Sequence, residues 1–82
     1  MAGQADLQQW VIGVGRELGL SLQNGDDDFF DGGGDSLDAV RLIERAEEEF
    51  GADALPPDDL YSGSTVREIA ATLSRSATRD TV

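Results

Sequence analysis

Apolar residues recur at helical spacing in three separate stretches of this 82-residue chain, and this pattern restricts the possible fold more than any other feature. The three sets are Leu7, Trp10, Val11, Val14 and Leu18; Ala39, Val40, Ile43, Ala46 and Phe50; and Val66, Ile69, Ala70, Leu73 and Ala77. Each set predicts an amphipathic helix with one narrow apolar stripe. Because a neighbour must cover a narrow stripe, the three helices are predicted to share one core in an all-α domain.

Capping residues indicate where these helices begin and end. Gly19 and Gly51 follow the first two stripes and predict helix ends, and residues 65–68 have the capping-box pattern that starts a helix. A short helical turn is predicted over residues 58–61, because the proline pair at 56–57 suits a helix start. The expected fold is therefore a small four-helix bundle, with three main helices and a short third helix.

A long loop, from Gly19 to Gly34, connects the first two helices. A loop of this length in a compact domain is anchored or functional, so apolar residues within it are expected to be buried. The candidate anchors are Leu20, Leu22 and at least one of Phe29 and Phe30. We expect residues 1–82 to form a single domain, with a core over about 5–75 and frayed ends beyond it.

The composition excludes most kinds of chemistry. The chain has no Cys, His or Lys, so it lacks disulfides, thiolate and imidazole metal ligands, the usual general base and a Schiff-base amine. Autonomous catalysis and a metal site with thiolate or imidazole ligands are therefore not expected, and we assign no metal ligands. No apolar run approaches the roughly 18 residues of a spanning helix, and no secretory pattern follows Met1. We expect a cytoplasmic protein that does not enter a membrane.

The net charge of −11 is concentrated in the middle of the chain. Between Asp26 and Asp59 there are thirteen acidic residues and only two basic ones, Arg41 and Arg45, whereas the charges elsewhere cancel. Such a field repels nucleic acid and anionic membranes and attracts proteins with basic patches. The alternative interpretation is that the acidic residues only keep a small protein soluble.

One serine lies at the centre of this acidic segment, in the pentapeptide from Gly33 to Leu37. Asp35 is a good N-cap, and Asp38 can complete a short capping box, so Ser36 falls at the junction of a glycine-rich loop and a helix. A helix N-terminus offers unpaired N–H groups and a positive dipole end, which favour a phosphoryl group there. On these residues alone, a simple helix start is the competing interpretation.

The predicted second helix also has a face that a purely structural role does not require. Leu37, Arg41, Glu44 and Glu48 share one side of the helix, largely opposite the core stripe, and the series begins next to Ser36. An exposed leucine beside charged residues suggests a docking surface. Any bundle helix has a charged outer face, however, so an ordinary solvated surface is the alternative.

Residues 28–73 resemble the acyl and peptidyl carrier proteins, which receive phosphopantetheine on a serine. Residues 29–37, with paired Phe before Gly-Gly-Asp-Ser-Leu, resemble the carriers of nonribosomal peptide assembly lines. Residues 35–50 resemble carriers of fatty-acid and polyketide type, whereas residues 60–70 resemble the downstream block of the peptidyl group. The three blocks occur in order and at family spacing, which is more specific than any one of them.

The resemblance implies a mechanism and a set of partners. A separate phosphopantetheinyl transferase, using coenzyme A and Mg²⁺, would attach 4′-phosphopantetheine to Ser36, beside Gly34, Asp35 and Leu37. An adenylation or acyltransferase enzyme would load the arm, and condensing or tailoring enzymes would use the cargo. The chain would be a non-catalytic, monomeric shuttle for aminoacyl or acyl thioesters in natural-product assembly. Partners would read Leu37, Arg41, Glu44 and Glu48.

Two departures from the family pattern bear on the subfamily. Gly32 stands where the family usually has an apolar residue, which predicts a missing loop anchor and a mobile approach to Ser36. Ser64 stands where proline is frequent, which removes a rigid helix start. Peptidyl and acyl subfamilies both remain open, because the second helix favours the acyl type. The initial Met1 suggests a free-standing carrier, although an excised domain would look similar.

Two alternatives belong to other functional classes. A calcium-binding module is suggested by Asp26, Asp27, Asp28, Asp31 and Asp35. Only a 12-residue loop starting at Asp27 satisfies the glycine and final acidic positions of an EF-hand, and it puts Phe29 at a ligand position. The second alternative, an acidic helical interaction domain without a prosthetic group, leaves the placement of Gly-Gly-Asp-Ser-Leu unexplained.

Overall fold

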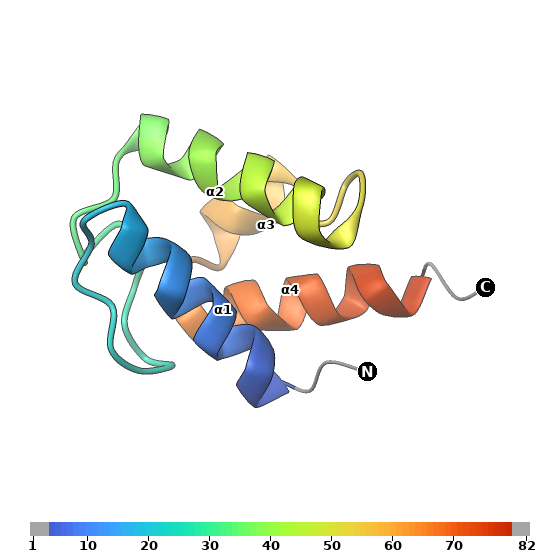
Figure 1. Ribbon diagram of the computed structural model, residues 1–82, viewed down its shortest axis with the longest axis horizontal. Helices are drawn as coiled ribbons and strands as arrows, with labels where there is room; N and C mark the ends of the chain where they lie inside the picture. The colour runs from blue at the N-terminus through green and yellow to red at the C-terminus, as the bar shows by residue number, and fades with distance from the viewer. Residues whose placement is uncertain (1–3, 80–82) are drawn as a thin grey trace.

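The computed structural model describes residues 4–79, and the side chains of 5–75. This part of the chain forms four helices: α1 (Gln4–Glu17), α2 (Ser36–Phe50), α3 (Pro57–Ser62) and α4 (Val66–Arg79) (Figure 1). It contains no named strand, only one isolated bridge between Asp28 and Thr65. The predicted all-α fold with a short third helix is confirmed. The predicted fraying concerns residues 1–4 and 76–82, whose side chains lie outside the described residues, although the backbone of α4 remains helical to Arg79.

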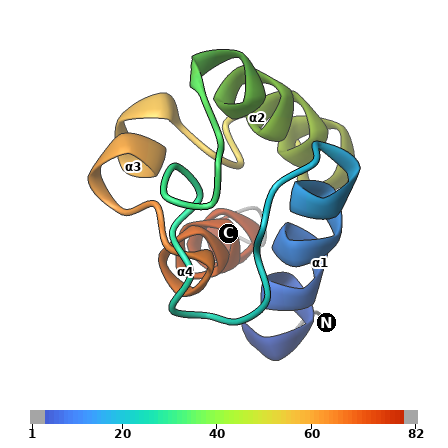
Figure 2. The same cartoon turned by 90° about the vertical axis from the view of Figure 1, so that its left-hand side faces the viewer.

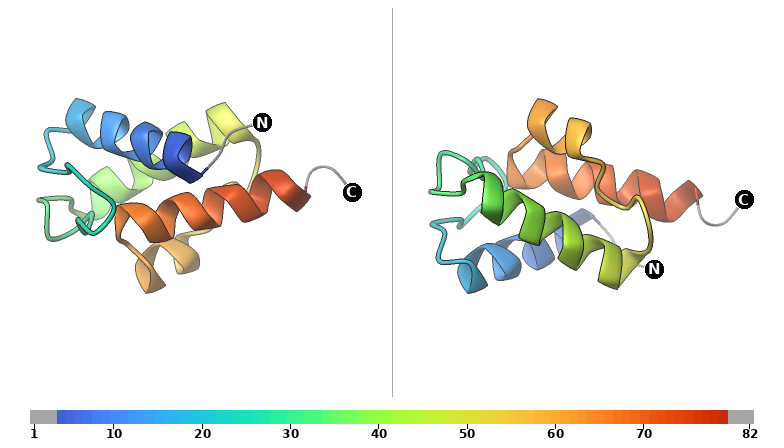
Figure 3. Two further views of the ribbon diagram at one scale, coloured as in Figure 1. Left: turned by 90° about the horizontal axis from the view of Figure 1, so that it is seen from below. Right: turned by 90° about the horizontal axis from the view of Figure 1, so that it is seen from above.

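The helices surround a shared core in which α4 is central. Seen end-on, α4 lies among α1, α2 and α3 (Figure 2). Among the described residues, the most extensive contact between any two helices is that of α1 with α4. The long loop, the start of α2 and the start of α4 all lie at one end of the bundle, opposite the start of α1 and the end of α4 (Figures 1 and 3). This end of the bundle is therefore where Ser36 is found.

Most of the predicted stripes are buried, but the stripe of α2 is rotated from its predicted position. Val40, predicted to be in the core, has 49% of its surface exposed, whereas Leu42 is fully buried. Val40 follows the buried Ala39 directly and so points about 100° away from it around the helix axis. Leu42 and Ala46 lie three and seven residues after Ala39, on the same side of the helix. Ala77 lies outside the described side chains.

The two predicted helix ends, at Gly19 and Gly51, and the capping box predicted at residues 65–68 are confirmed. Gly19 has φ of +83°, and the N–H of Leu20 donates to the carbonyl of Gly15 at 2.8 Å, which is a Schellman ending for α1. The N–H of Gly51 donates to Glu47 at the end of α2. At the start of α4, the side chains of Thr65 and Glu68 each accept a bond from the other residue's N–H, at 3.1 and 3.2 Å.

The long loop is anchored as predicted, by Leu20, Leu22 and Phe29, all of them buried. Phe30 is half-buried against the core. At the opposite end of α2, the rings of Trp10 and Phe50 meet edge to face, with centroids 5.0 Å apart. Aromatic contacts thus secure α1 to the end of α2.

Candidate functional site

Ser36 is the first residue of α2, and its side chain is exposed. Among the residues that the structure describes, its hydroxyl has no hydrogen-bond partner, and neither do the backbone N–H groups of Ser36 and Leu37. These are the orphan donors of a helix start. The serine therefore presents a free hydroxyl beside two N–H groups that can face an anionic substituent.

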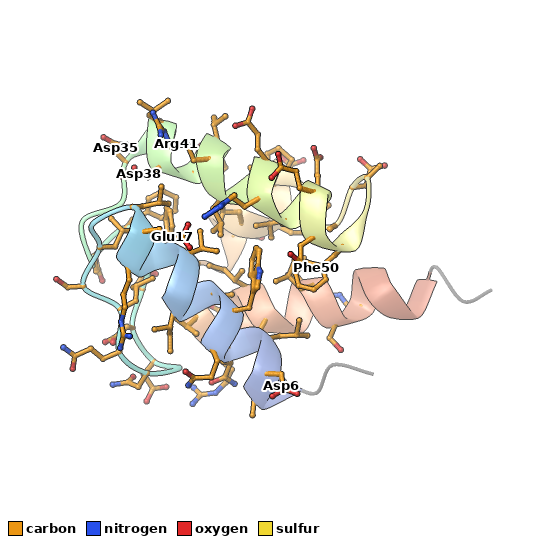
Figure 4. The ribbon with its side chains drawn as sticks, in the orientation of Figure 1. Asp6, Glu17, Asp35, Asp38, Arg41 and Phe50 are labelled. Atoms are coloured by element: carbon orange, nitrogen blue, oxygen red, sulfur yellow. The ribbon has the colours of Figure 1, made fainter. Side chains whose placement is uncertain are left out.

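Two carboxylates hold the backbone on either side of Ser36. The Asp38 N–H donates to Asp35 Oδ1 at 2.9 Å, and the Asp35 N–H donates to Asp38 Oδ2 at 3.2 Å. This reciprocal capping box is the one that the sequence predicts. Figure 4 shows Asp35 and Asp38 together at the end of α2 that meets the long loop. The capping box fixes the backbone direction at the serine and leaves two negative charges next to it.

Gly34 packs directly against the buried residue Phe29. A Cβ atom at this residue would lie 2.6 Å from Phe29 Cε2 and 2.7 Å from the Phe29 carbonyl oxygen. The Gly34 N–H donates to that same carbonyl at 3.0 Å. Carbon atoms in contact normally lie about 3.5–4.0 Å apart, so only glycine fits here without displacing the buried ring. Gly34 thus sets the path of the chain two residues before Ser36.

Asp28 fastens the loop to the junction of α3 and α4. Its Oδ2 accepts a hydrogen bond of 2.6 Å from the Ser64 hydroxyl, and its Oδ1 accepts from the N–H groups of Phe30 and Asp31. The Phe29 N–H donates to the Ser64 carbonyl at 2.8 Å. Partial burial tends to raise the pKa of Asp28, but these three hydrogen bonds together outweigh burial and hold the pKa below its usual value.

The two departures from the family pattern have structural roles. A proline at position 64 would lack the hydroxyl that Ser64 donates to Asp28. At Gly32, a Cβ atom would lie 2.9 Å from Leu22 Cδ2, so Leu22 fills the space of the missing side chain. The N–H of Gly32 donates to Asp28 and its carbonyl accepts from Ser21, at 2.8 and 3.0 Å. The expected gap at Gly32 is therefore filled, and its backbone is tied on both sides.

The predicted recognition face is on the outside of the bundle. Leu37 has 59% of its surface exposed, and Arg41, Glu44 and Glu48 are also exposed. Arg41 projects outward from the first half of α2 in Figure 4. Exposure fits a docking surface, while the role of these four residues stays a prediction.

Two further exposed apolar residues were not predicted from the sequence. Val40 lies one helical turn after Ser36, and Tyr61 of α3 has 56% of its surface exposed. The Tyr61 ring stacks on Phe30, with centroids 5.6 Å apart and planes 9° from parallel. Val40 could have been identified from the sequence as a residue beside Ser36, because it follows Ser36 by four positions. Nothing in the sequence pattern indicates the contact between Tyr61 and Phe30, because it joins the loop to a separate helix.

Comparison with known proteins identifies the family. The family described as "Phosphopantetheine attachment site" matches residues 13–73, which include every residue of the site. The chain belongs to this family of carrier domains. The chain is also 34% identical, over 70 residues, to malformin synthetase mlfA of Aspergillus brasiliensis. That alignment covers 85% of this chain but only 1% of the synthetase. No solved structure matches the chain.

Carrier domains of the phosphopantetheine attachment family hold 4′-phosphopantetheine covalently and are non-catalytic substrates of phosphopantetheinyl transferases. The site fits such a group, because it offers a free serine hydroxyl with two unpaired N–H groups at a helix start. Within residues 4–79 there is no cluster of three or more His, Cys, Asp or Glu that could hold a metal ion. No helix in this part of the chain is long and apolar enough to cross a membrane.

Proposed function

We propose that this carrier domain is phosphopantetheinylated on Ser36 and shuttles an aminoacyl or acyl thioester between biosynthetic enzymes. The observation that carries the proposal is the geometry of Ser36, an exposed hydroxyl at the first position of α2. The family match supports the attachment chemistry, and the capping box and Gly34 give the serine a defined backbone.

The chain's own residues bind and position the arm. The Ser36 hydroxyl would lose its proton and form the phosphodiester bond, with the adenosine bisphosphate part of coenzyme A as the leaving group. The N–H groups of Ser36 and Leu37 can then face the anionic oxygens. Asp35 and Asp38 raise the local negative charge, which the positive end of α2 and their own capping bonds offset. The bound arm supplies a thiol, which accepts the cargo as a thioester.

Partner enzymes would approach the exposed residues around Ser36. We propose the phosphopantetheinyl transferase, an adenylation or acyltransferase loading enzyme, and downstream condensing or tailoring enzymes as these partners. Similarity to a synthetase favours the peptidyl carrier type, with the acyl carrier of fatty-acid or polyketide type as the alternative. We further propose that the domain acts as a monomer in the cytoplasm.

The test is the intact mass after incubation with coenzyme A, Mg²⁺ and a broad-specificity phosphopantetheinyl transferase. We expect a gain of one phosphopantetheine by the parent protein and none by Ser36→Ala, which should stay folded because the side chain is exposed. Ser62→Ala is the matched control and should be modified normally. A calcium-binding module or a plain interaction domain would gain no such mass. Modification of Ser36→Ala would refute the proposal.

A further inference from the structure

A groove between α1 and α2 lies apart from the serine and has no role in the proposed attachment chemistry. It encloses about 300 Å³ and is lined by Trp10, Gly13, Val14, Glu17, Arg45, Glu48 and Glu49. Glu17 of α1, labelled in Figure 4, forms an ion pair with Arg45 of α2. A second hollow shares Glu17, Arg45 and Glu48 with the first and continues the groove along the seam toward Arg41.

Gly13 keeps the floor of this groove open. Glycine within a helix costs about 1 kcal/mol relative to alanine, so a mid-helix glycine calls for a reason. Gly15 has one, because a Cβ atom there would lie 2.5 Å from Leu22 Cδ1. At Gly13 a Cβ atom would meet nothing within 4 Å. Packing inside the domain therefore does not account for Gly13, and the space beside this residue, which lines the groove, is open.

The chemistry of the groove suits a positively charged side chain. Arg45 is neutralised by Glu17, while Glu48 and Glu49 have no ion-pair partner among the described residues. Trp10 is half-buried, and its indole borders the same hollow. A guanidinium group stacks well on an indole face and pairs with carboxylates in a planar, bidentate way. The methylene groups of an arginine can lie on the apolar floor at the same time.

We propose that this groove binds an arginine side chain of a partner protein, with its stem over Gly13 and its guanidinium group between Trp10 and the carboxylates of Glu48 and Glu49. Charge complementarity selects this occupant, because the charged side chains of the first hollow that lack an ion pair among the described residues, Glu48 and Glu49, are both negative. A second copy of the chain is disfavoured by its own charge of −11.

The position of the groove separates it from the attachment chemistry. Glu48 is twelve residues after Ser36, which corresponds to about 18 Å along the helix. By helical geometry, Ser36 and Glu48 also point to different sides of α2. A partner protein could therefore bind the groove while the active site of a second enzyme acts on Ser36.

The experiment uses the single tryptophan, Trp10, as the reporter on the unmodified protein. We would titrate acetyl-Ala-Arg-Ala-amide while following the Trp10 emission at constant ionic strength, with the citrulline peptide as the uncharged control. We expect saturable binding of the arginine peptide only. Glu48→Gln with Glu49→Gln should weaken it about fivefold, or about 1 kcal/mol. Gly13→Leu should abolish it by filling the floor.

Glu47→Gln with Asp58→Asn is the matched control, because it removes the same charge from exposed residues outside the groove. An equal loss of affinity for the arginine peptide in both double variants would mean that the overall charge of the protein explains the binding. That result would overturn the proposal. Equal binding of the citrulline peptide, or no saturable change up to about 10 mM, would also overturn it, since even a weak side-chain complex is populated there. A change in Trp10 emission with protein concentration alone, without peptide, would indicate that a second copy of the chain occupies the groove instead. None of these outcomes depends on modification of Ser36.

Discussion

Gly34→Ala is the substitution that most directly tests how the loop positions the serine. The new methyl carbon would lie 2.6 and 2.7 Å from two carbons of the Phe29 ring and 2.7 Å from its carbonyl oxygen. These distances are about 1 Å shorter than normal carbon contacts. The Phe29 ring is fully buried, so it cannot swing into solvent to relieve the overlap.

The expected cost follows from these contacts. Overpacking of a tight core costs about 1–3 kcal/mol, and the entropy that alanine removes from the unfolded chain returns about 0.4–1 kcal/mol. The net destabilisation is therefore about 1–2 kcal/mol. For a domain of this size, each kcal/mol shifts Tm by about 4–8 °C, so Gly34→Ala should lower Tm by roughly 5–15 °C. The matched control is Gly13→Ala, which makes the same chemical change in open space and should raise Tm by about 3–6 °C.

Thermal unfolding by circular dichroism measures both shifts, and the rate of phosphopantetheine transfer below both melting transitions measures the effect on the serine. Because Gly34 directs the chain two residues before Ser36, we expect slower transfer to Gly34→Ala and unchanged transfer to Gly13→Ala. If Gly34→Ala melted at or above the parent temperature and was modified at the parent rate, close packing of Gly34 on Phe29 would not be what positions the loop.

Three other predictions concern recognition and pH. Leu37→Asp should slow transfer by the transferase far more than it lowers Tm, because the side chain is largely exposed; a large fall in Tm with unchanged transfer kinetics would contradict this. Glu44→Gln with Glu48→Gln should lower the rate of association with the transferase and flatten its dependence on salt, as measured by stopped flow. An unchanged dependence on salt would mean that these two carboxylates contribute to solubility and not to association. Ser64→Ala should raise the pKa of Asp28 in the folded state toward its usual value, because a hydrogen bond to the carboxylate is lost. A lowered folded-state pKa stabilises the fold above the unfolded-state pKa, so the variant's deficit in denaturant unfolding should be full at pH 7 and shrink below about pH 4; a deficit independent of pH would exclude Asp28 as its source.

Local signals made most of the fold predictable. Helix ends at Gly19 and Gly51 and the capping boxes at Asp35 and Thr65 depend on residues within five positions of each other, and the structure shows all of them. The error at Val40 has a different origin. Val40 and Leu42 are both apolar, and only the direction from which the neighbouring helices approach α2 decides which of them is buried.

Long-range contacts were the part of the site that the sequence could not predict. The bond from Ser64 to Asp28 joins residues 36 positions apart, and the stacking of Tyr61 on Phe30 joins a loop to a separate helix. Neither pair has a periodic pattern, because their proximity depends on how the loop folds over the start of α4. Ser36 itself was predictable, since its surroundings at the helix start are local.

The attachment of the loop to α4 also has a consequence for the order of events during synthesis. Backbone bonds from Val66 to Asp27 and from Arg67 to Gly25 tie the loop to the first turn of α4, as does the ion pair between Arg67 and Asp26. We therefore expect the loop to take its final path only after this turn has left the ribosome and docked, because contacts of such separation close late. A nascent chain that ends before residue 67 would thus contain the serine but lack the surface that encloses its loop. Transfer of the arm is therefore expected to follow completion of the whole domain.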